Sequence, residues 1–363
     1  MPDARLVLAD GSVFEGSSIG APGHAVGEVV FNTSMTGYQE MLTDPSYAGQ
    51  LLTLTYPIIG NYGIDPAVDE SSRIQPTGLI VREAAVSPSH LLSTGTISSY
   101  LQERGVVGVE GVDTRAITRR IRQHGVMPGT ITTHESAPEA LERLRSMPDY
   151  DNVNWVSTVT TTAAYDWDDS AGRHRVALLD GGVKRNIMRS LAARGCSVRI
   201  FPATTSAADL LAMNPDGIVL SPGPGDPRLL ESMVAETKCL IGKAPLLGIC
   251  LGHQVVAQAL GAGTFKLPFG HRGGNHPVKD TITGRVTVTA QNHGYAVDAD
   301  GLSASAFVSH VNLNDQTVEG IALRNEPLLT IQYHSEACPG PLDNAAIFDR
   351  FVTMMATVRG GVS

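Results

Sequence analysis

The sequence predicts an α/β protein with two domains, and three observations support this prediction. The chain has 363 residues, more than one hydrophobic core usually holds. In its second half, short apolar runs alternate with amphipathic helical patterns, which indicates βαβ units and an open, mainly parallel sheet flanked by helices. Its first half contains alternating strand patterns and fewer helical ones, which indicates a β-rich mixed α/β domain. We therefore expect domains at 1–150 and 175–363, joined by a linker at 151–174.

The N-terminal domain is expected to begin with a β-hairpin. The string LVLADGSVFEG contains two alternating segments around Asp10-Gly11, a pair of residues that favours a two-residue hairpin turn. The later string SSYLQERG is a helical pattern. Between residues 151 and 174 the sequence is polar and lacks any period, as expected of a linker.

The C-terminal domain is expected to carry its functional groups where strands end. Strands are predicted for VALLD, CSVRIF, GIVLSPG and APLLGI, and later for TVTAQNHGYAV, VEGIALRN and LLTIQYH. Helices are predicted for KRNIMRSLAARG, TSAADLLAMN, PRLLESMVAETKCL and the closing segment DNAAIFDRFVTMMATV. Ligands bind at the carboxyl ends of strands in open α/β sheets. The turns SPGPGDP, GICLGHQ and QYHSE are therefore the expected site.

Composition excludes several classes of protein. The sequence is 42% hydrophobic and 17% charged, and it has no apolar window as long as a membrane span. A net charge of −9 without a basic patch argues against nucleic-acid binding. Four scattered cysteines are too few for a disulfide scaffold, so free thiols are expected. The opening MPDARLVLADGS lacks the apolar core of a signal peptide, and we expect a cytoplasmic protein.

Cys250 is the candidate nucleophile. The apolar run LLGI leads directly into this cysteine, a helical pattern follows at once, and Gly248 and Gly252 lie two residues to either side. This arrangement has the strand-turn-helix logic of a nucleophile elbow, in which glycines relieve crowding at a tight turn. The start of a helix favours the reactive thiolate, and the N–H of Leu251 is placed to donate to an oxyanion. The alternative is a buried structural cysteine, because cysteine is among the most buried residue types.

Three histidines are candidates for the base that such a thiol needs. His253 lies in the first turn after the cysteine, where its ring is expected to point away from the thiol. His293 belongs to the string QNHG. His334 ends an apolar run, and Glu336 follows two residues later, on the same side of an extended segment. A carboxylate beside an imidazole fixes its tautomer, so Cys250, His334 and Glu336 form the preferred triad.

Several long strings resemble known families. PLLGICLGHQ, SPGPGDP and QYHSEACPGP resemble the class I, or triad-type, glutamine amidotransferases. FNTSMTGYQEMLTDPSYAGQLLTLTYPIIGNYG, FGHRGGNHPVKD and TAQNHGYAVD resemble the small subunits of glutamine-hydrolysing carbamoyl-phosphate synthase, over nearly the whole chain. The resemblance implies hydrolysis of glutamine to glutamate and ammonia, with Cys250 as nucleophile, His334 as general base and then acid, and Glu336 as the group that orients it.

The resemblance also implies which residues bind glutamine. It places the oxyanion donors on the N–H groups of Leu251 and Gly223. The remaining implied substrate-binding positions are Ser46 of the first domain and Gly225, Gln254, Asn292, Gly294 and Tyr295 of the second. One position departs from the family pattern, because Ser335 stands where the family has proline between the histidine and the glutamate. Loss of that proline removes some stiffness from the turn, and we expect activity to survive.

No metal or cofactor is expected in this chain. His271 and His276 lie close together in FGHRGGNHP, but no neighbouring cysteine or carboxylate completes a ligand set. The chain also lacks a G-x-x-x-x-G-K-[ST] nucleotide loop. The resemblance places ATP and its metal ion on a large synthetase subunit, which would receive ammonia through a tunnel and make carbamoyl phosphate for arginine and pyrimidine biosynthesis. The N-terminal domain is the expected docking surface.

Three alternatives remain open at this stage. The chain could serve another synthase, although amidotransferases of other pathways generally lack the extra N-terminal domain. It could be a catalytically silent subunit, against which the intact Cys250, His334 and Glu336 argue. It could also be a general cysteine hydrolase, which would cleave amides that lack a free α-amino acid end.

Overall fold

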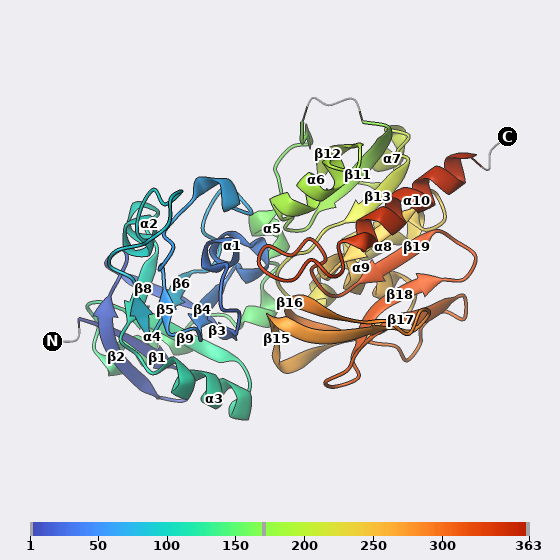
Figure 1. Cartoon of the computed structure of the whole chain (residues 1–363). Helices are drawn as coiled ribbons and strands as arrows, with labels where there is room; N and C mark the ends of the chain where they lie inside the picture. The colour runs from blue at the N-terminus through green and yellow to red at the C-terminus, as the bar shows by residue number, and fades with distance from the viewer. Residues whose placement is uncertain (1–2, 169–171, 361–363) are drawn as a thin grey trace. The chain divides into compact units, whose positions relative to one another are not determined.

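The computed structural model describes residues 3–168 and 172–360, and the chain forms two compact units, Met1–Val153 and Asn154–Ser363 (Figure 1). Within the described residues, no helix combines the length and the apolar character needed to cross a membrane. Each unit has its own hydrophobic core.

The first unit is built on a closed barrel of strands in the order β1-β2-β8-β6-β4-β3-β9, with a separate two-stranded sheet, β5-β7. The barrel strands are β1 (Ala4–Leu8), β2 (Val13–Ser18), β3 (His24–Asn32), β4 (Gln50–Leu54), β6 (Gly78–Ile80), β8 (Val107–Glu110) and β9 (Met127–Thr132). The small sheet pairs β5 (Ile58–Ile59) with β7 (Glu83–Ala84). The prediction of a β-rich mixed domain is confirmed.

The β1–β2 hairpin forms, but its predicted two-residue turn is wrong. Val7 pairs with Val13, and the N–H of Leu8 donates to the carbonyl of Ser12. Gly11 has a φ of 86° and its N–H donates to the carbonyl of Leu8, so the loop is one residue longer than predicted. This is the three-residue hairpin loop with a left-handed glycine. The Asp10 carboxylate stabilises it by accepting a hydrogen bond from the N–H of Ser12.

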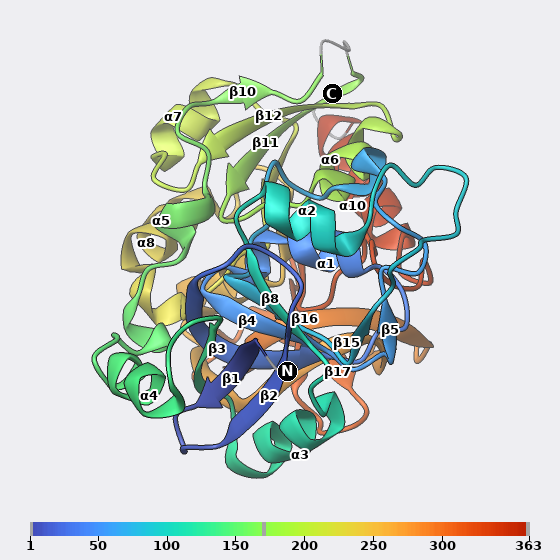
Figure 2. The ribbon, with the colours of Figure 1, turned by 90° about the vertical axis from the view of Figure 1, so that its left-hand side faces the viewer.

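Helices of the first unit pack around the barrel. They are α1 (Tyr38–Thr43), α2 (Ile97–Glu103), α3 (Thr114–His124) and α4 (Ala137–Arg145), with short 3₁₀ helices η1 (Pro45–Tyr47), η2 (Pro66–Val68) and η3 (Tyr150–Asn152). Helix α2 is the one predicted from SSYLQERG, and Thr96 and Ser99 cap its start reciprocally. Figure 2 shows α2 and α3 on opposite sides of the barrel strands.

The second unit contains the predicted open sheet, in the strand order β10-β12-β11-β13-β14-β19-β18-β16-β15-β17. Five neighbours run parallel, namely β12 (Cys196–Pro202), β11 (His174–Asp180), β13 (Gly217–Leu220), β14 (Leu246–Ile249) and β19 (Leu328–Ile331). The others pair antiparallel and are β10 (Tyr165–Asp166), β15 (Gly263–Asp280), β16 (Val286–Asp298), β17 (Ala306–Asn312) and β18 (Val318–Leu323). The mainly parallel α/β sheet is confirmed for its central part.

Helices cover both faces of the parallel strands (Figure 1). The first face carries α6 (Arg185–Ala192) and α10 (Ala346–Gly360), and the other carries α7 (Ala207–Ala212), α8 (Glu231–Leu240) and α9 (Leu251–Ala259). Successive strand residues point to opposite faces. Accordingly Leu178 packs with the first group, whereas Leu179 packs with the second. Burial on both sides explains why these strands read as continuous apolar runs.

The segment predicted as a linker contains regular structure. Residues 151–174 include most of η3, the short helix α5 (Val156–Val159), strand β10 and the first residue of β11. Strand β10 pairs antiparallel with β12, so this part of the segment belongs to the sheet of the second unit. The part of the predicted linker at 169–171 lies outside the described residues.

Candidate active site

Cys250 lies at the sharp turn between strand β14 and helix α9. Its backbone has φ 52° and ψ −104°, a conformation that a residue with a side chain rarely adopts. The strand holds this turn in place, because the N–H of Cys250 donates to the carbonyl of Ile331 at 2.8 Å. The thiol is buried, and its sulfur lies 3.8 Å from the carbonyl oxygen of Asn292. The predicted strand-turn-helix elbow is thus confirmed.

The two glycines beside the elbow leave no room for side chains. A Cβ atom on Gly252 would lie 2.2 Å from the carbonyl oxygen of Leu220, on the neighbouring strand β13. A Cβ atom on Gly248 would lie 2.8 Å from the carbonyl oxygen of Gly252. Both distances are far below van der Waals contact, so glycine at these positions lets helix α9 pack directly on the sheet.

His334 and Glu336 follow strand β19, next to the elbow, and they contact each other. Nδ1 of His334 lies 2.6 Å from Oε1 of Glu336, and both side chains are buried. The carboxylate therefore holds the proton on Nδ1 and leaves Nε2 free. Among the described residues, Nε2 of His334 has no hydrogen-bond partner. A buried ring nitrogen without a partner is what a proton acceptor for the thiol requires.

The charges of the site support a protonated His334. Burial opposes the imidazolium, but the Glu336 carboxylate and the sulfur of Cys250 outweigh it and raise the pKa of His334 to about 10. Burial likewise opposes the Glu336 carboxylate, yet Lys184 and His334 lower its pKa to about 2. The N–H of Cys250 donates to the carbonyl of Ile331, the last residue of β19, so the elbow adjoins the segment that carries His334. The arrangement can therefore hold an imidazolium at His334 beside an ionised Glu336.

Lys184 is a buried member of the site that the sequence reasoning missed. Its Nζ atom lies 3.1 Å from Oε1 of Glu336 and donates to the carbonyl of Ala337 at 2.7 Å. Lys184 thereby fixes the orienting carboxylate and balances its charge. Lys184 lies in the turn DGGVK, which follows strand β11. Its position just after the carboxyl end of a parallel strand is the sequence signal that could have identified it as a site residue.

The predicted oxyanion donors lie next to each other, one at the start of helix α9 and the other in the loop after strand β13. Leu251 is the first residue of helix α9, where an N–H has no partner inside the helix. A Cβ atom on Gly223 would lie 2.6 Å from Cδ2 of Leu251 and 2.2 Å from the carbonyl oxygen of Gly181. Gly223 therefore packs against the start of α9. The absence of a side chain there would also let its backbone approach a ligand closely. Gly225 has a φ of 90°, and a Cβ atom there would lie 3.3 Å from Trp155.

Four of the predicted glutamine-binding positions of the second unit lie on strand β16 or contact it. This strand carries Asn292, Gly294 and Tyr295, and the carbonyl of Asn292 reaches the Cys250 sulfur. The side-chain amide of Gln254 donates to the carbonyl of Tyr295 at 2.8 Å and to Gln332 at 3.0 Å. Gln254 therefore ties helix α9 to β16.

Ser46, the predicted contribution of the first unit, lies in η1, where its N–H donates to Asp44 at 2.9 Å. Its part in glutamine binding stays a prediction.

The other two candidate bases are engaged elsewhere. Nδ1 of His253 lies 2.7 Å from the Thr330 hydroxyl, and burial lowers the pKa of His253 to about 3. Nδ1 of His293 lies 2.7 Å from the carbonyl of Tyr295, and burial together with the charge of His271 holds the pKa of His293 well below its usual range. Both contacts are made by Nδ1, to a hydroxyl and to a backbone carbonyl, whereas Nδ1 of His334 meets the Glu336 carboxylate. The role of His334 as the base stays a prediction.

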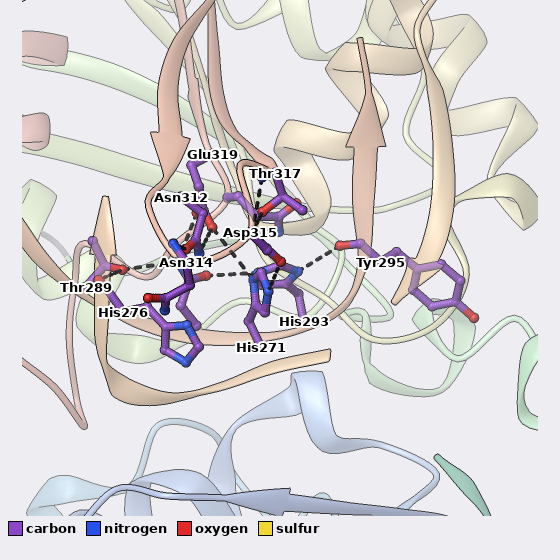
Figure 3. Close-up of polar contacts among 12 residues, drawn as sticks. His271, His276, Thr289, His293, Tyr295, Asn312, Asn314, Asp315, Thr317 and Glu319 are labelled. Carbon is purple, nitrogen blue, oxygen red and sulfur yellow. Dashed lines mark hydrogen bonds and ion pairs between the residues drawn. The ribbon is translucent and has the colours of Figure 1, made fainter. Parts of the chain in front are cut away.

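The structure also brings together groups that could hold a metal. His271, His293 and Glu319 place one ligand atom each within 4.8 Å of one another, and all three are buried (Figure 3). The expectation that no carboxylate completes a ligand set beside His271 is therefore wrong, because Glu319 comes from a distant strand. His276 lies near this group, with its ring centroid 5.2 Å from that of His271.

Comparisons with known proteins agree with the two-unit architecture. Residues 6–131 match the family model described as carbamoyl-phosphate synthase small chain, CPSase domain, and residues 177–354 match glutamine amidotransferase class-I. A carbamoyl phosphate synthase small chain of Syntrophotalea carbinolica is 49% identical over 366 residues, covering 97% of each chain. A chloroplastic one of Arabidopsis thaliana is 45% identical, covering 97% of this chain and 85% of the relative.

Solved structures are similar to about half of this chain. A protein of Thermoplasma acidophilum described as a putative GMP synthase component is 23% identical, with a TM-score of 0.46, and the match covers 52% of this chain and 96% of that one. A glutamine amidotransferase of Thermotoga maritima is 17% identical, with a TM-score of 0.37, and the match covers 52% and 86%.

Proposed function

The chain belongs to the carbamoyl-phosphate synthase small-chain family, and we propose that Cys250, His334 and Glu336 carry out its glutamine hydrolysis. The observation that carries this proposal is the orphan Nε2 of a buried His334, next to a thiol at the tip of an elbow. The family membership supplies the substrate class, and the site supplies the chemistry. The catalytic steps follow from the contacts of these side chains.

Acylation begins with the Cys250 thiolate, whose proton resides on Nε2 of His334. The sulfur attacks the side-chain amide carbon of glutamine, and the N–H groups of Leu251 and Gly223 stabilise the resulting oxyanion. The C–N bond then breaks as His334 gives its proton to the departing nitrogen. Ammonia leaves, and a glutamyl thioester remains on Cys250.

Deacylation uses the same groups in reverse order. The neutral His334 takes a proton from water, and the hydroxide attacks the thioester carbon. The C–S bond breaks, glutamate departs, and the thiolate is regenerated beside the imidazolium. The net reaction consumes glutamine and water and releases glutamate and ammonia. Glu336 and Lys184 stay charged throughout and hold the ring in one orientation.

A larger partner chain is part of this proposal. Relatives of this chain are named small chains, which implies a larger partner. We propose that this partner is the large synthetase subunit, which would bind ATP and metal and turn the released ammonia into carbamoyl phosphate for arginine and pyrimidine biosynthesis. The 1–153 unit, which matches the family's own domain, is the proposed docking surface.

The proposed place of action is the cytoplasm. Cys196, Cys239, Cys250 and Cys338 are all free thiols in the structure. Free thiols, and a nucleophilic one above all, suit a reducing compartment. Fractionation of cells of the native source, followed by detection of this chain, tests the assignment.

The experiment that tests the function uses Cys250→Ser in the complex assembled with the large subunit. Glutamine-dependent carbamoyl phosphate synthesis is expected to vanish, whereas added ammonia still supports synthesis. Cys239→Ser, at an exposed cysteine, is the matched control and is expected to keep both activities. Persistent glutamine use by Cys250→Ser would refute the assignment. Loss of the ammonia-dependent reaction as well would show that the substitution had damaged the complex and not the chemistry alone.

A further inference from the structure

Three neighbouring strands of the second unit bring together a buried group that glutamine hydrolysis does not use. His271 lies on β15, His293 on β16 and Glu319 on β18, and we call them the histidine-glutamate cluster. His271 and His293 are paired directly across β15 and β16. Figure 3 shows both rings near the Glu319 carboxylate, with Tyr295 on the far side of His293.

His271 presents an unpartnered nitrogen to the cluster. Its Nε2 atom lies 2.8 Å from the Asp315 carboxylate, to which it donates a hydrogen bond. Its Nδ1 atom is buried without a hydrogen-bond partner among the described residues, and the residue is only 7% exposed. This Nδ1 atom lies 3.8 Å from Oε1 of Glu319. A protonated nitrogen would draw the carboxylate to about 2.7–2.9 Å, so the gap does not fit a direct hydrogen bond.

A neutral His293 ring carries one N–H proton, but each of its two nitrogens lies against a hydrogen-bond acceptor. Its Nδ1 atom lies 2.7 Å from the carbonyl oxygen of Tyr295, which can only accept, so Nδ1 carries the proton. Its Nε2 atom lies 2.9 Å from Oε1 of Gln291. In a neutral ring this places a lone pair against an oxygen. A doubly protonated ring would be a buried cation, which is costly at 6% exposure.

The orientation of Gln291 is not free to remove this conflict. Its Nε2 atom donates to Oε2 of Glu319 at 2.9 Å and to the Thr289 hydroxyl at 3.1 Å. Turning the amide over would place its oxygen against the Glu319 carboxylate, where two acceptors would repel. The oxygen of Gln291 therefore stays toward His293.

Glu319 is a fully buried carboxylate with little positive charge around it. It accepts hydrogen bonds from the amides of Gln291 and Asn312, which fix its position. Among the described residues its one ion pair is the 3.8 Å approach of His271. A buried charge needs a closer counter-charge than this.

A cation between these atoms resolves all three observations. We propose that the histidine-glutamate cluster binds one divalent transition metal ion of the Zn²⁺ type through Nδ1 of His271, Nε2 of His293 and the Glu319 carboxylate. The Gln291 oxygen is the fourth ligand. A tetrahedral site with bonds of about 2.0–2.1 Å places its ligand atoms ~3.3 Å apart. The 2.9 Å between His293 and Gln291 and the 3.8 Å between His271 and Glu319 bracket this value, and the ligand atoms of His271, His293 and Glu319 all lie within 4.8 Å of one another.

The outer contacts of the cluster are those of metal-bound histidines. Such rings usually donate their second nitrogen to a carboxylate or a backbone carbonyl, which fixes the tautomer. His271 donates to Asp315 and His293 donates to Tyr295 in this way. The ion would fasten β15, β16 and β18 together, and β16 carries Asn292 beside Cys250. The proposal does not depend on the reaction at Cys250.

Metal binding is tested on the full-length chain, stripped with a chelator and then titrated with Zn²⁺. Elemental analysis after dialysis is expected to find one Zn²⁺ per chain, and the melting temperature is expected to rise on binding. His271→Gln and Glu319→Gln are expected to lose both effects. Asp315→Asn keeps the ligands and is expected to weaken binding by about 10–100-fold, because Asp315 only orients His271.

Two control variants exclude binding elsewhere. His276→Gln removes the neighbouring ring that lies outside the cluster, and it is expected to retain one Zn²⁺ per chain. His134→Gln disrupts the other group with metal-ligand spacing, His24, His134 and Glu135, whose Glu135 is already bound by Arg143. It too is expected to leave the stoichiometry unchanged.

The unmodified chain provides a test that does not depend on a variant folding. Co²⁺ bound in place of Zn²⁺ is expected to give the visible absorption of a four-coordinate ion. A wild-type chain that takes up no Zn²⁺ would overturn the proposal. The buried cation of the cluster would then be a protonated His271. Equal Zn²⁺ uptake by wild type, His271→Gln and Glu319→Gln would overturn it as well.

Discussion

Nδ1 of His334 lies 2.6 Å from Oε1 of Glu336, and neither side chain is more than 3% exposed. This contact decides which nitrogen of the ring faces Cys250. Because the carboxylate takes Nδ1, the proton that moves during hydrolysis must travel through Nε2. Lys184 contacts the same carboxylate oxygen, Oε1 of Glu336, at 3.1 Å. The chemistry of the site thus depends on a chain of three buried side chains behind the thiol.

Glu336→Gln is expected to lower kcat for glutamine hydrolysis by about 10²–10⁴-fold, with little change in KM. The amide keeps the shape of the carboxylate but removes the charge that stabilises the imidazolium, so the pKa of His334 falls from its present value of about 10. Steady-state release of glutamate measures the effect. Glu326→Gln, at an exposed glutamate of the same unit, is the control. A variant at position 336 with wild-type kcat would remove Glu336 from the mechanism.

Stability is expected to depend on His334 in alkaline solution. Its pKa in the folded chain, about 10, lies above the ordinary 6.5. A raised pKa contributes stability that is fully present below pH 6.5 and is lost as the pH rises through 10. The difference in unfolding free energy between wild type and His334→Asn should therefore shrink across this window. Urea denaturation at several pH values measures it, and a difference that stays constant would contradict the assigned charge.

Gly252→Ala is expected to destabilise the second unit by about 1–3 kcal/mol, because the added Cβ meets backbone and helix α9 must move off the sheet. Its nearest neighbour would be the Leu220 carbonyl at 2.2 Å. Gly263→Ala is the matched control, since its Cβ would meet only the Asp298 Cβ, at 3.7 Å. Denaturant midpoints compare the two variants. Equal midpoints would show that the elbow tolerates a side chain at position 252.

Ser335→Ala is expected to keep full activity and to leave stability unchanged or slightly raised. The Ser335 hydroxyl is buried and has no hydrogen-bond partner among the described residues, so its removal breaks no contact. The backbone around it is held instead by the His334 N–H, which donates to Ala290 at 2.9 Å. Glutaminase assays and thermal unfolding check both parts. A large loss of kcat would show that the hydroxyl orients Glu336.

The elements that local patterns specify could be predicted from the sequence. The Cys250 elbow could be predicted because the tight turn needs residues without side chains, and Gly248 and Gly252 supply them within five residues of sequence. The pair His334 and Glu336 could be predicted because residues two positions apart in an extended segment point to the same side. The parallel central part of the sheet followed from apolar runs that are buried on both faces.

Contacts between distant segments could not be predicted in this way. Lys184 meets Glu336 across 152 positions of sequence, and no local pattern marks a lysine that becomes buried by an ion pair. Glu319 reaches His271 because β18 and β15 flank β16, an order that apolar periodicity does not specify. The β1–β2 loop was predicted too short because Asp10-Gly11 suits both a two-residue and a three-residue hairpin.

Mass spectrometry after treatment with a glutamine-analogue alkylating agent tests the central claim most directly, because such a reagent must bind as glutamine does and then meet a thiolate. We expect a single modification, on Cys250, that excess glutamine suppresses and that His334→Asn slows. The exposed Cys239 in the same chain serves as an internal control and should remain unmodified. A Cys250 that stays unlabelled, or labelling of Cys239 in its place, would contradict the assignment of Cys250 as the nucleophile.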